Sequence, residues 1–393
     1  MTILEATGCF LLMVTAAIML LGTISGNRRI SYKDYEILLF LMMLGVLILV
    51  YEFDPRETIR FDINEHYKTL DLIKQGGWKY AFTEGEYKSL VVTTLYYYLI
   101  SWIGNYRLLP ILPLITEFLI FRYILFDQLH RKYPEKIPFA DVSFIVYTWT
   151  ATIGIMLAIT GIRCVWAISI AVLAVYREYI KEKKGALEIL LYIIPVFIHT
   201  FALIVPVIRC LIHVKRKKLM LAVLMICMVA GPYAISFIAN FLGFNYLKYM
   251  LMQALKYWTN RNVIYWFRAV SNSTRTIYIC FVIIIAFLFY ILHEIKKQKK
   301  YLDAEDDRII KAADTIAYCS IAVLYNYLFL ERYMYMIAFL FVLIMPLYHI
   351  YRIRTLNNQL INIFSCLVML WQFFFHDIYI FLVNFTGVYF LAS

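Results

Sequence analysis

Long apolar runs separated by short polar stretches dominate the 393-residue chain. A helix that spans a membrane needs about 20 mostly apolar residues. Runs of about that length predict spanning helices at 6–25, 37–51, 108–126, 139–160, 164–180, 219–243, 276–292, 313–330, 333–348 and 360–375. Shorter apolar runs lie at 90–103, 187–198, 200–212 and 378–391. The pattern predicts an all-α polytopic integral membrane protein with about 10–12 transmembrane helices, some of them broken or re-entrant.

Composition and charge support the same fold class. Hydrophobic residues make up 63% of the chain and charged residues 16%, which excludes an ordinary soluble domain. The net charge of +12 does not indicate a nucleic-acid partner, because the basic residues form short clusters beside apolar runs. These clusters lie at 27–33, 131–136, 177–184, 213–218, 296–300 and 352–354. The positive-inside rule assigns all six to the cytoplasmic side.

That assignment constrains the short apolar runs. Residues 187–212 lie between two basic clusters, and a single crossing would carry the second cluster outside. We therefore expect a hairpin of two half-length helices, broken near Pro195 and with its tip near His199. The run 90–103 poses the same problem, and we expect it to lie along the outer surface or to re-enter.

Two long segments then face outward from one transmembrane domain that covers 1–393. The first extracytoplasmic loop, 52–89, carries six basic and eight acidic residues. The second segment, 244–275, is basic and aromatic and contains no acidic residue, a composition typical of the membrane interface.

Sequence motifs for cofactors and metals are absent. The chain has no CxxC, no HExxH and no glycine-rich nucleotide-binding loop, so we expect no metal, no cofactor and no ATP-driven pump. Because the cytoplasmic segments are small, we expect an active site to face outward.

Ionisable residues beside apolar helices are costly, and each is a candidate for function. Arg163, His199 and Arg332 stand out in this way. Each has a structural alternative: Arg163 can snorkel to headgroups, His199 can be a satisfied buried polar group, and Arg332 can pair with Glu331 at the surface.

Further candidates lie on the outward segments. Arg268 and Arg275 join Arg163 and Arg332 as outward arginines near helix ends, and arginine binds phosphate through a fixed fork of donors. In the first loop, Asp54, Asp62 and His66 are candidate bases, and Arg56 and Arg60 are candidate anion binders. The alternative for these loop charges is a solvated face.

Four short motifs in this order resemble the Wzy-type polysaccharide polymerases, in particular their EpsG-like branch. They are Phe61–Tyr67 with its acidic residues and tyrosine, Gly161-Ile-Arg163, Phe197–Leu203 around His-Thr, and Glu331-Arg-Tyr333. Their order and spacing match over about residues 35–350.

The resemblance implies a GT-C-like glycosyltransferase architecture in the bacterial cytoplasmic membrane, with the site facing the periplasm or exterior. It implies transfer of a glycan from undecaprenyl pyrophosphate to a sugar hydroxyl of a second lipid-linked repeat unit, with inversion. The implied partners are the undecaprenyl-pyrophosphate-linked oligosaccharide, membrane lipid, and the chain-length regulator and flippase of the same pathway.

Residue roles follow from combining this resemblance with the residue types. His199 positions or deprotonates the acceptor hydroxyl, and Asp62 and His66 are alternative bases. The catalytic set is His199, Arg163 and Asp62. The substrate-binding set is Arg332, Arg268, Arg275, His66, Tyr67 and Arg60.

Two other functions fit the sequence. One is a glycosyltransferase that uses a polyprenyl monophosphate sugar, with an acidic residue of the first loop as its base. The other is a flippase for lipid-linked oligosaccharides, which would need polar groups along a full path through the membrane.

Overall fold

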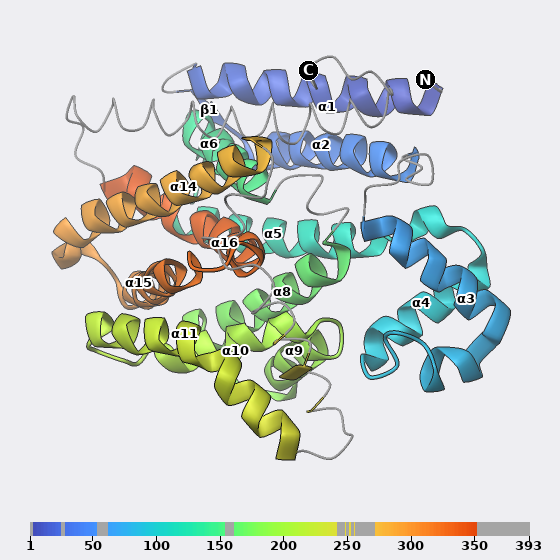
Figure 1. The fold of residues 1–393 in the computed structure, drawn as a ribbon. Coiled ribbons are helices and arrows are strands. Elements are labelled where there is room, and N and C mark those ends of the chain that lie inside the picture. Colours follow the sequence, from blue (N-terminus) through green and yellow to red (C-terminus); the bar gives the residue numbers. More distant parts are fainter. Residues whose placement is uncertain are drawn as a thin grey trace. The chain divides into compact units, whose positions relative to one another are not determined.

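The computed structural model describes residues 3–24, 28–52, 62–153, 161–241 and 272–351, together with residues 248, 251, 252 and 255. Within these ranges the chain forms thirteen α-helices and one two-stranded antiparallel sheet (Figure 1). The predicted span 360–375, the run 378–391 and most of 244–275 lie outside the described residues.

Five helical stretches in the described part are long and apolar enough to cross a membrane. They are Tyr32–Glu52, Tyr106–Lys132, Lys217–Phe241, Tyr278–Lys297 and Tyr327–Tyr351. The protein is therefore an all-α polytopic membrane protein, as its sequence predicts. The remaining apolar helices in the described part are shorter or less apolar.

The described chain forms two compact units, one up to Trp166 and one from Ala167 onward, and each is described by itself. The first contains α1 (Ile3–Ile24), β1 (Arg29–Ile30), α2 (Tyr32–Glu52), α3 (Asp62–Thr83), α4 (Val91–Ile103), the 3-10 turn η2 (Tyr106–Leu108), α5 (Ile111–Lys132), β2 (Ile137–Pro138), α6 (Phe139–Ile153) and the start of α8 (Ile162–Val175).

Helices α1 and α2 approach each other closely through glycine. A Cβ atom added at Gly45 would lie 2.9 Å from the backbone nitrogen of Leu12 and 3.0 Å from the carbonyl oxygen of Gly8. Small residues of this kind let apolar helices pack backbone to backbone within a membrane.

Helices α2 and α5 run antiparallel and define two ends of the first unit. At one end, β1 pairs with β2 through Ile30 and Ile137, and the Tyr32 hydroxyl donates to the Tyr133 carbonyl oxygen at 2.6 Å. At the other end, Asn105 Nδ2 donates to the Tyr51 hydroxyl at 3.0 Å. The basic clusters 27–33 and 131–136 therefore share one end of the unit.

The segment 52–89 contains helix α3, which packs against α4 at the end away from these basic clusters. Gly77 interrupts α3 with a φ of 64°. Gly104 ends α4 in the left-handed region, with a φ of 79° and an N–H that donates to the Ile100 carbonyl. Both angles favour glycine, which lacks a Cβ.

The second unit holds the rest of α8, the π-helical turn η3 (Tyr176–Ile180), α9 (Ala186–Val196), η4 (Thr200–Leu203), α10 (Ile204–Leu211), α11 (Lys217–Phe241), α14 (Asn272–Lys297), η5 (Lys299–Tyr301), α15 (Ala304–Val323) and α16 (Tyr327–Tyr351). Helix α16 is its core, buried almost continuously from Tyr333 to Tyr348 against α14 and α15.

One predicted boundary is wrong. The sequence predicts spans at 313–330 and 333–348 with Arg332 between them, but α15 ends at Val323 and α16 begins at Tyr327. Asn326 begins the new helix, because its Oδ1 accepts the Phe329 N–H at 3.2 Å. Arg332 consequently lies within α16 and not in a turn between two spans.

The basic clusters of the second unit also gather at one end. Lys217 Nζ donates to Thr315 Oγ1 at 2.6 Å, Lys181 pairs with Glu305 at 3.0 Å, and Lys296 pairs with Asp314. All three partners lie in the first twelve residues of α15. The clusters 177–184, 213–218 and 296–300 therefore share one end, and 352–354 lies outside the described residues.

Candidate functional site

Two ion pairs hold the two ends of the segment 187–212 at the same place. Arg177 pairs with Glu188 at the start of α9 at 2.8 Å. Arg209, near the end of α10, donates to both carboxylate oxygens of Glu178, at 2.6 and 2.9 Å. Since Arg177 and Glu178 are adjacent, the segment leaves and returns at the same end of the unit. The predicted hairpin of two half-length helices is confirmed.

The tip of this hairpin is His199, as its sequence predicts. Helix α9 ends one residue after Pro195. His199 is extended, with φ −152° and ψ 130°, and its Nδ1 accepts the Phe201 N–H at 3.1 Å. Only 7% of its surface is exposed. In a neutral ring whose Nδ1 accepts a hydrogen bond, Nε2 carries the proton. This arrangement suits His199 to donate a hydrogen bond at Nε2 better than to remove a proton there.

Other predicted residues lie at the same end of the second unit. The Phe201 ring stacks on Phe329 at 5.7 Å between centroids, which brings the hairpin tip to the first turn of α16, one turn before Arg332. The Tyr278 hydroxyl donates to the Leu324 carbonyl at 2.9 Å, and Arg275 lies in the turn of α14 just before it. His199, Arg275 and Arg332 thus lie at the end opposite the basic clusters.

The first unit brings Arg163 and His66 together. The Arg163 guanidinium, in the first turn of α8, lies 3.8 Å from the centroid of the Tyr87 ring. The Tyr87 hydroxyl lies 3.3 Å from His66 Nδ1, and the Tyr97 and His66 rings form a T-shaped pair with centroids 5.8 Å apart. A guanidinium over a ring face makes a cation–π contact, which favours this orientation of the group.

His66 is neutral in this cluster. It is 6% exposed, and burial, assisted by the positive charge of Arg163, holds its pKa well below the usual range. Its neighbour Tyr67 is buried too, but turns to a different partner and packs its ring against Tyr106 at 5.7 Å.

Sequence reasoning missed the aromatic residues that complete the Arg163 cluster. Tyr96 contacts Tyr97 and the Trp166 ring, the latter at 5.1 Å. The available signal was the run Tyr96-Tyr97-Tyr98, three successive tyrosines in the short apolar run 90–103.

The predicted site residues are divided between the two units. Arg163, His66 and Tyr67 belong to the first, and His199, Arg275 and Arg332 to the second. Asp62 is the first residue of α3. Arg60 and Arg268 lie outside the described residues. Among the described residues, no three histidine, cysteine or acidic side chains are grouped to hold a metal ion.

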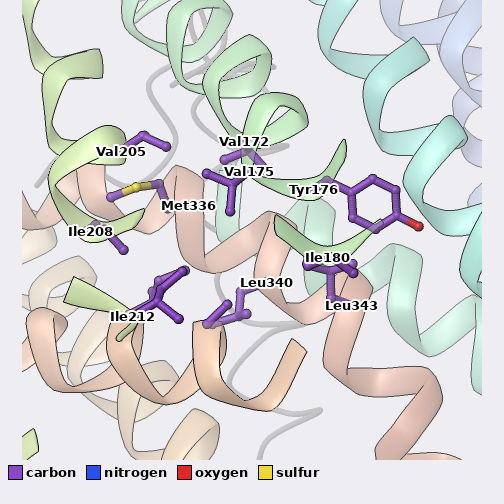
Figure 2. A pocket seen from close by; sticks show the side chains of 12 residues that line it. Val172, Val175, Tyr176, Ile180, Val205, Ile208, Ile212, Met336, Leu340 and Leu343 are labelled. Atoms are coloured by element: carbon purple, nitrogen blue, oxygen red, sulfur yellow. The ribbon is translucent and has the colours of Figure 1, made fainter. Parts of the chain in front are cut away.

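The second unit also contains a small apolar cavity of about 40 Å³ (Figure 2). It lies between α8, η3, α10, α15 and α16, and its lining is aliphatic apart from the thioether of Met336 and the ring of Tyr176, whose hydroxyl points away from it. Ligand pockets usually measure about 300–1,000 Å³ and contain a few polar groups. The cavity is therefore a packing gap beside the hairpin and not a sugar site.

Glu117 is a buried carboxyl group outside both clusters. It lies within the candidate span Tyr106–Lys132 and is 1% exposed. Its Oε1 has no hydrogen-bond partner among the described residues. An ionisable group at such a place is rare in membrane helices, and it is not among the site residues predicted from the sequence.

Comparison of the chain with known protein families, curated proteins and solved structures finds no match. The geometry of the two clusters and the four sequence motifs therefore carry the functional argument.

Proposed function

We propose that this chain is a polysaccharide polymerase of the Wzy type, similar to the EpsG-like branch, acting at the outer face of the bacterial cytoplasmic membrane. One observation carries the proposal. In each unit, the predicted site residues that are described occupy the end opposite the basic clusters. Since basic clusters mark the cytoplasmic side, both groups of residues face outward.

The proposed reaction exchanges one bond for another. The bond between the anomeric carbon of the donor glycan and the pyrophosphate oxygen breaks, and undecaprenyl pyrophosphate leaves with the bonding electrons. A hydroxyl oxygen of the acceptor unit attacks the same carbon and loses its proton to a base. The negative charge that grows on the pyrophosphate is the feature that the protein has to stabilise.

Arginine suits that task without a metal, because its planar fork binds two oxygen atoms at once. Arg163 is proposed to bind the pyrophosphate from the first unit. The Tyr87 ring under its guanidinium holds the group in one orientation. In the second unit, Arg332 and Arg275 are proposed to bind phosphate or the donor glycan, with Arg268 as a further candidate.

His199 and His66 are proposed to have different roles in the reaction. His199 donates from Nε2 and orients the acceptor hydroxyl or a pyrophosphate oxygen, since its Nδ1 is engaged with the Phe201 N–H. His66 is neutral and can accept a proton, and Asp62 is the alternative base. An ordinary histidine transfers protons near neutral pH, and the depressed pKa of His66 makes it a weaker base than that.

Deletion of the gene, followed by analysis of the surface glycan and the lipid-linked intermediates, tests the proposal. A polymerase deletion loses long polymer and accumulates single lipid-linked repeat units on the outer face. Wild-type protein restores the polymer, and the Arg163→Ala variant at equal abundance does not.

Two outcomes would overturn the proposal in favour of the other functions. Accumulation of the units on the cytoplasmic face would identify a flippase. A polymer of unchanged length that lacks one side sugar would identify a transferase that uses a polyprenyl monophosphate donor.

A further inference from the structure

Helix α4 buries its polar side chains and exposes its apolar ones. Thr94 and Ser101 are buried, and the Ser101 hydroxyl donates to the Leu70 carbonyl of α3 at 3.0 Å. On the other face, Leu95 is 42% exposed and Leu99 is 45% exposed. A helix at the surface of a water-soluble domain has the opposite arrangement, so α4 is built for an apolar environment.

The apolar face runs the whole length of α4. Val91, Leu95, Leu99 and Trp102 recur at helical spacing and are all exposed, Trp102 by 77%. An exposed apolar stripe of this extent marks a binding surface or a membrane contact.

Helix α3 precedes α4 and packs against it, and we call this pair the α3–α4 hairpin. In contrast to α4, helix α3 exposes charged side chains. Glu65 and Lys68 pair across one turn, with side chains 67% and 68% exposed. Lys74 and Lys79 are exposed further along the helix. The α3–α4 hairpin therefore exposes mainly charged side chains on α3, where Leu72 is also exposed, and apolar side chains on α4. Trp78, which contacts the Tyr98 ring at 5.1 Å, lies where the two helices meet.

The 3-10 turn η2 and the residue before it fix the height of α4 relative to the membrane. Arg107 pairs with Glu52 at 3.8 Å, and Asn105 bonds to Tyr51. These polar contacts join the end of the span Tyr32–Glu52 to the start of the span Tyr106–Lys132, so they mark the edge of the membrane. Helix α4 ends at Ile103, two residues before Asn105.

The length of α4 excludes a crossing. Thirteen residues extend about 20 Å at 1.5 Å per residue, whereas the hydrocarbon core is about 30 Å thick. Tryptophan is enriched at the membrane–water interface, and Trp102 lies at the end of α4 that adjoins the membrane edge.

We propose that the α3–α4 hairpin lies along the membrane surface, with the apolar face of α4 in the lipid and the charged face of α3 in water. The partner of this surface is the bilayer itself. The mostly aliphatic stripe favours lipid over a glycan, because sugars stack on aromatic rings flanked by polar groups.

Spin labels on the full-length protein in lipid vesicles test this placement. Leu95→Cys and Leu99→Cys are compared with the matched control Lys68→Cys, in a background whose seven native cysteines are replaced by alanine. Labels at 95 and 99 are expected to collide with oxygen at least several-fold more often than with a water-soluble nickel chelate, and the label at 68 the reverse. Both α4 labels are expected at equal depth, whereas a steep helix would separate them by about 6 Å.

Nickel access to the α4 labels equal to that at 68 would overturn the proposal, as would unequal depths. Protection of those labels by added soluble oligosaccharide would instead identify a glycan-binding face. If the cysteine-free background fails to fold, brominated lipid serves with all native cysteines in place. Trp102→Phe is expected to remove a large part of the quenched fluorescence, and unchanged quenching would contradict the lipid contact.

Discussion

Arg163 is held in the first unit by aromatic side chains, whereas His199 is held in the second unit by the backbone of a broken helix. The Tyr87 ring lies under the Arg163 guanidinium, and the Tyr87 hydroxyl in turn lies beside the buried His66. At the hairpin tip, the Phe201 N–H fixes the tautomer of the imidazole. The comparison teaches that neighbouring aromatic rings can orient a cationic side chain. A histidine that donates a hydrogen bond must in addition carry its proton on a defined ring nitrogen.

The largest effect is expected from Arg163→Lys. The substitution keeps the charge but loses the planar fork and its stacking on Tyr87. Loss of one group that stabilises transition-state charge costs about 10²–10³-fold in rate, and we expect the upper end. Polymer formed per unit of protein in a complemented deletion strain measures it.

Arg122→Lys is the matched control, because Arg122 pairs with Glu36 within the same unit but away from the Tyr87 cluster. Equal polymer from Arg163→Lys and wild type would remove Arg163 from the site.

His199→Asn separates the two roles of the imidazole. Asparagine can still accept the Phe201 N–H and keep the turn, but the Nε2 donor is lost. We expect about 10²-fold less polymer, which is the lower end of the rate losses caused by removing a group that donates or transfers a proton. The thermal stability is expected to be unchanged.

His199→Ala is the companion variant. It loses the backbone contact as well, and its unfolding free energy is expected to fall by about 1 kcal/mol relative to His199→Asn. Activity in the asparagine variant equal to wild type would reduce His199 to a structural cap.

Glu178→Gln tests whether the hairpin base positions the tip. The substitution weakens the two bonds from Arg209, and we expect a loss of about 1–2 kcal/mol in stability with only a several-fold loss of polymer. Thermal unfolding of the purified protein measures the first effect.

Asp314→Asn provides the control, since Asp314 pairs with Lys296 at the same end and makes no hydrogen bond or ion pair with residues 187–212 in the described part of the chain. Equal losses of polymer in both variants would mean that the hairpin base has no special influence on the tip.

The smallest effect concerns His66 and pH. Its folded pKa is depressed by burial and by Arg163, so the unfolded chain binds the proton more readily. Stability is therefore full above the unfolded pKa of about 6.5 and falls as the pH drops below it. The slope is at most about 1.4 kcal/mol per pH unit.

Unfolding of wild type and His66→Gln between pH 7.5 and 5.5 measures this slope. The variant is expected to lose it, and an identical pH dependence in both proteins would show that His66 is not the titrating group.

The hairpin tip was predictable because several local signals agree there. Pro195 breaks a helix, the flanking basic clusters forbid a single crossing, and His199 is polar in an apolar run. Arg332 was misplaced because a charged pair between apolar runs looks like a turn. Asn326 decides that boundary through one capping bond, which the hydrophobic pattern does not register.

The Arg163 cluster could not be assembled from the sequence. Its members come from α3, the turn before α4, α4 and α8, and nothing local links them. Aromatic residues make up 18% of the chain, so Tyr87 and Tyr97 do not stand out. Helix α4 buries polar side chains and exposes apolar ones, and a count of its apolar residues does not reveal this. The arrangement depends on which face of α4 packs against α3.

Reconstitution with the natural substrate tests the central claim most directly. Lipid-linked repeat units extracted from the deletion strain are incubated with the purified protein in vesicles, and both glycan and carrier lipid are analysed. A polymerase yields a ladder spaced by whole repeat units and releases one undecaprenyl pyrophosphate per new linkage. Release of undecaprenyl monophosphate, or units that remain single in the presence of folded protein, would contradict the account.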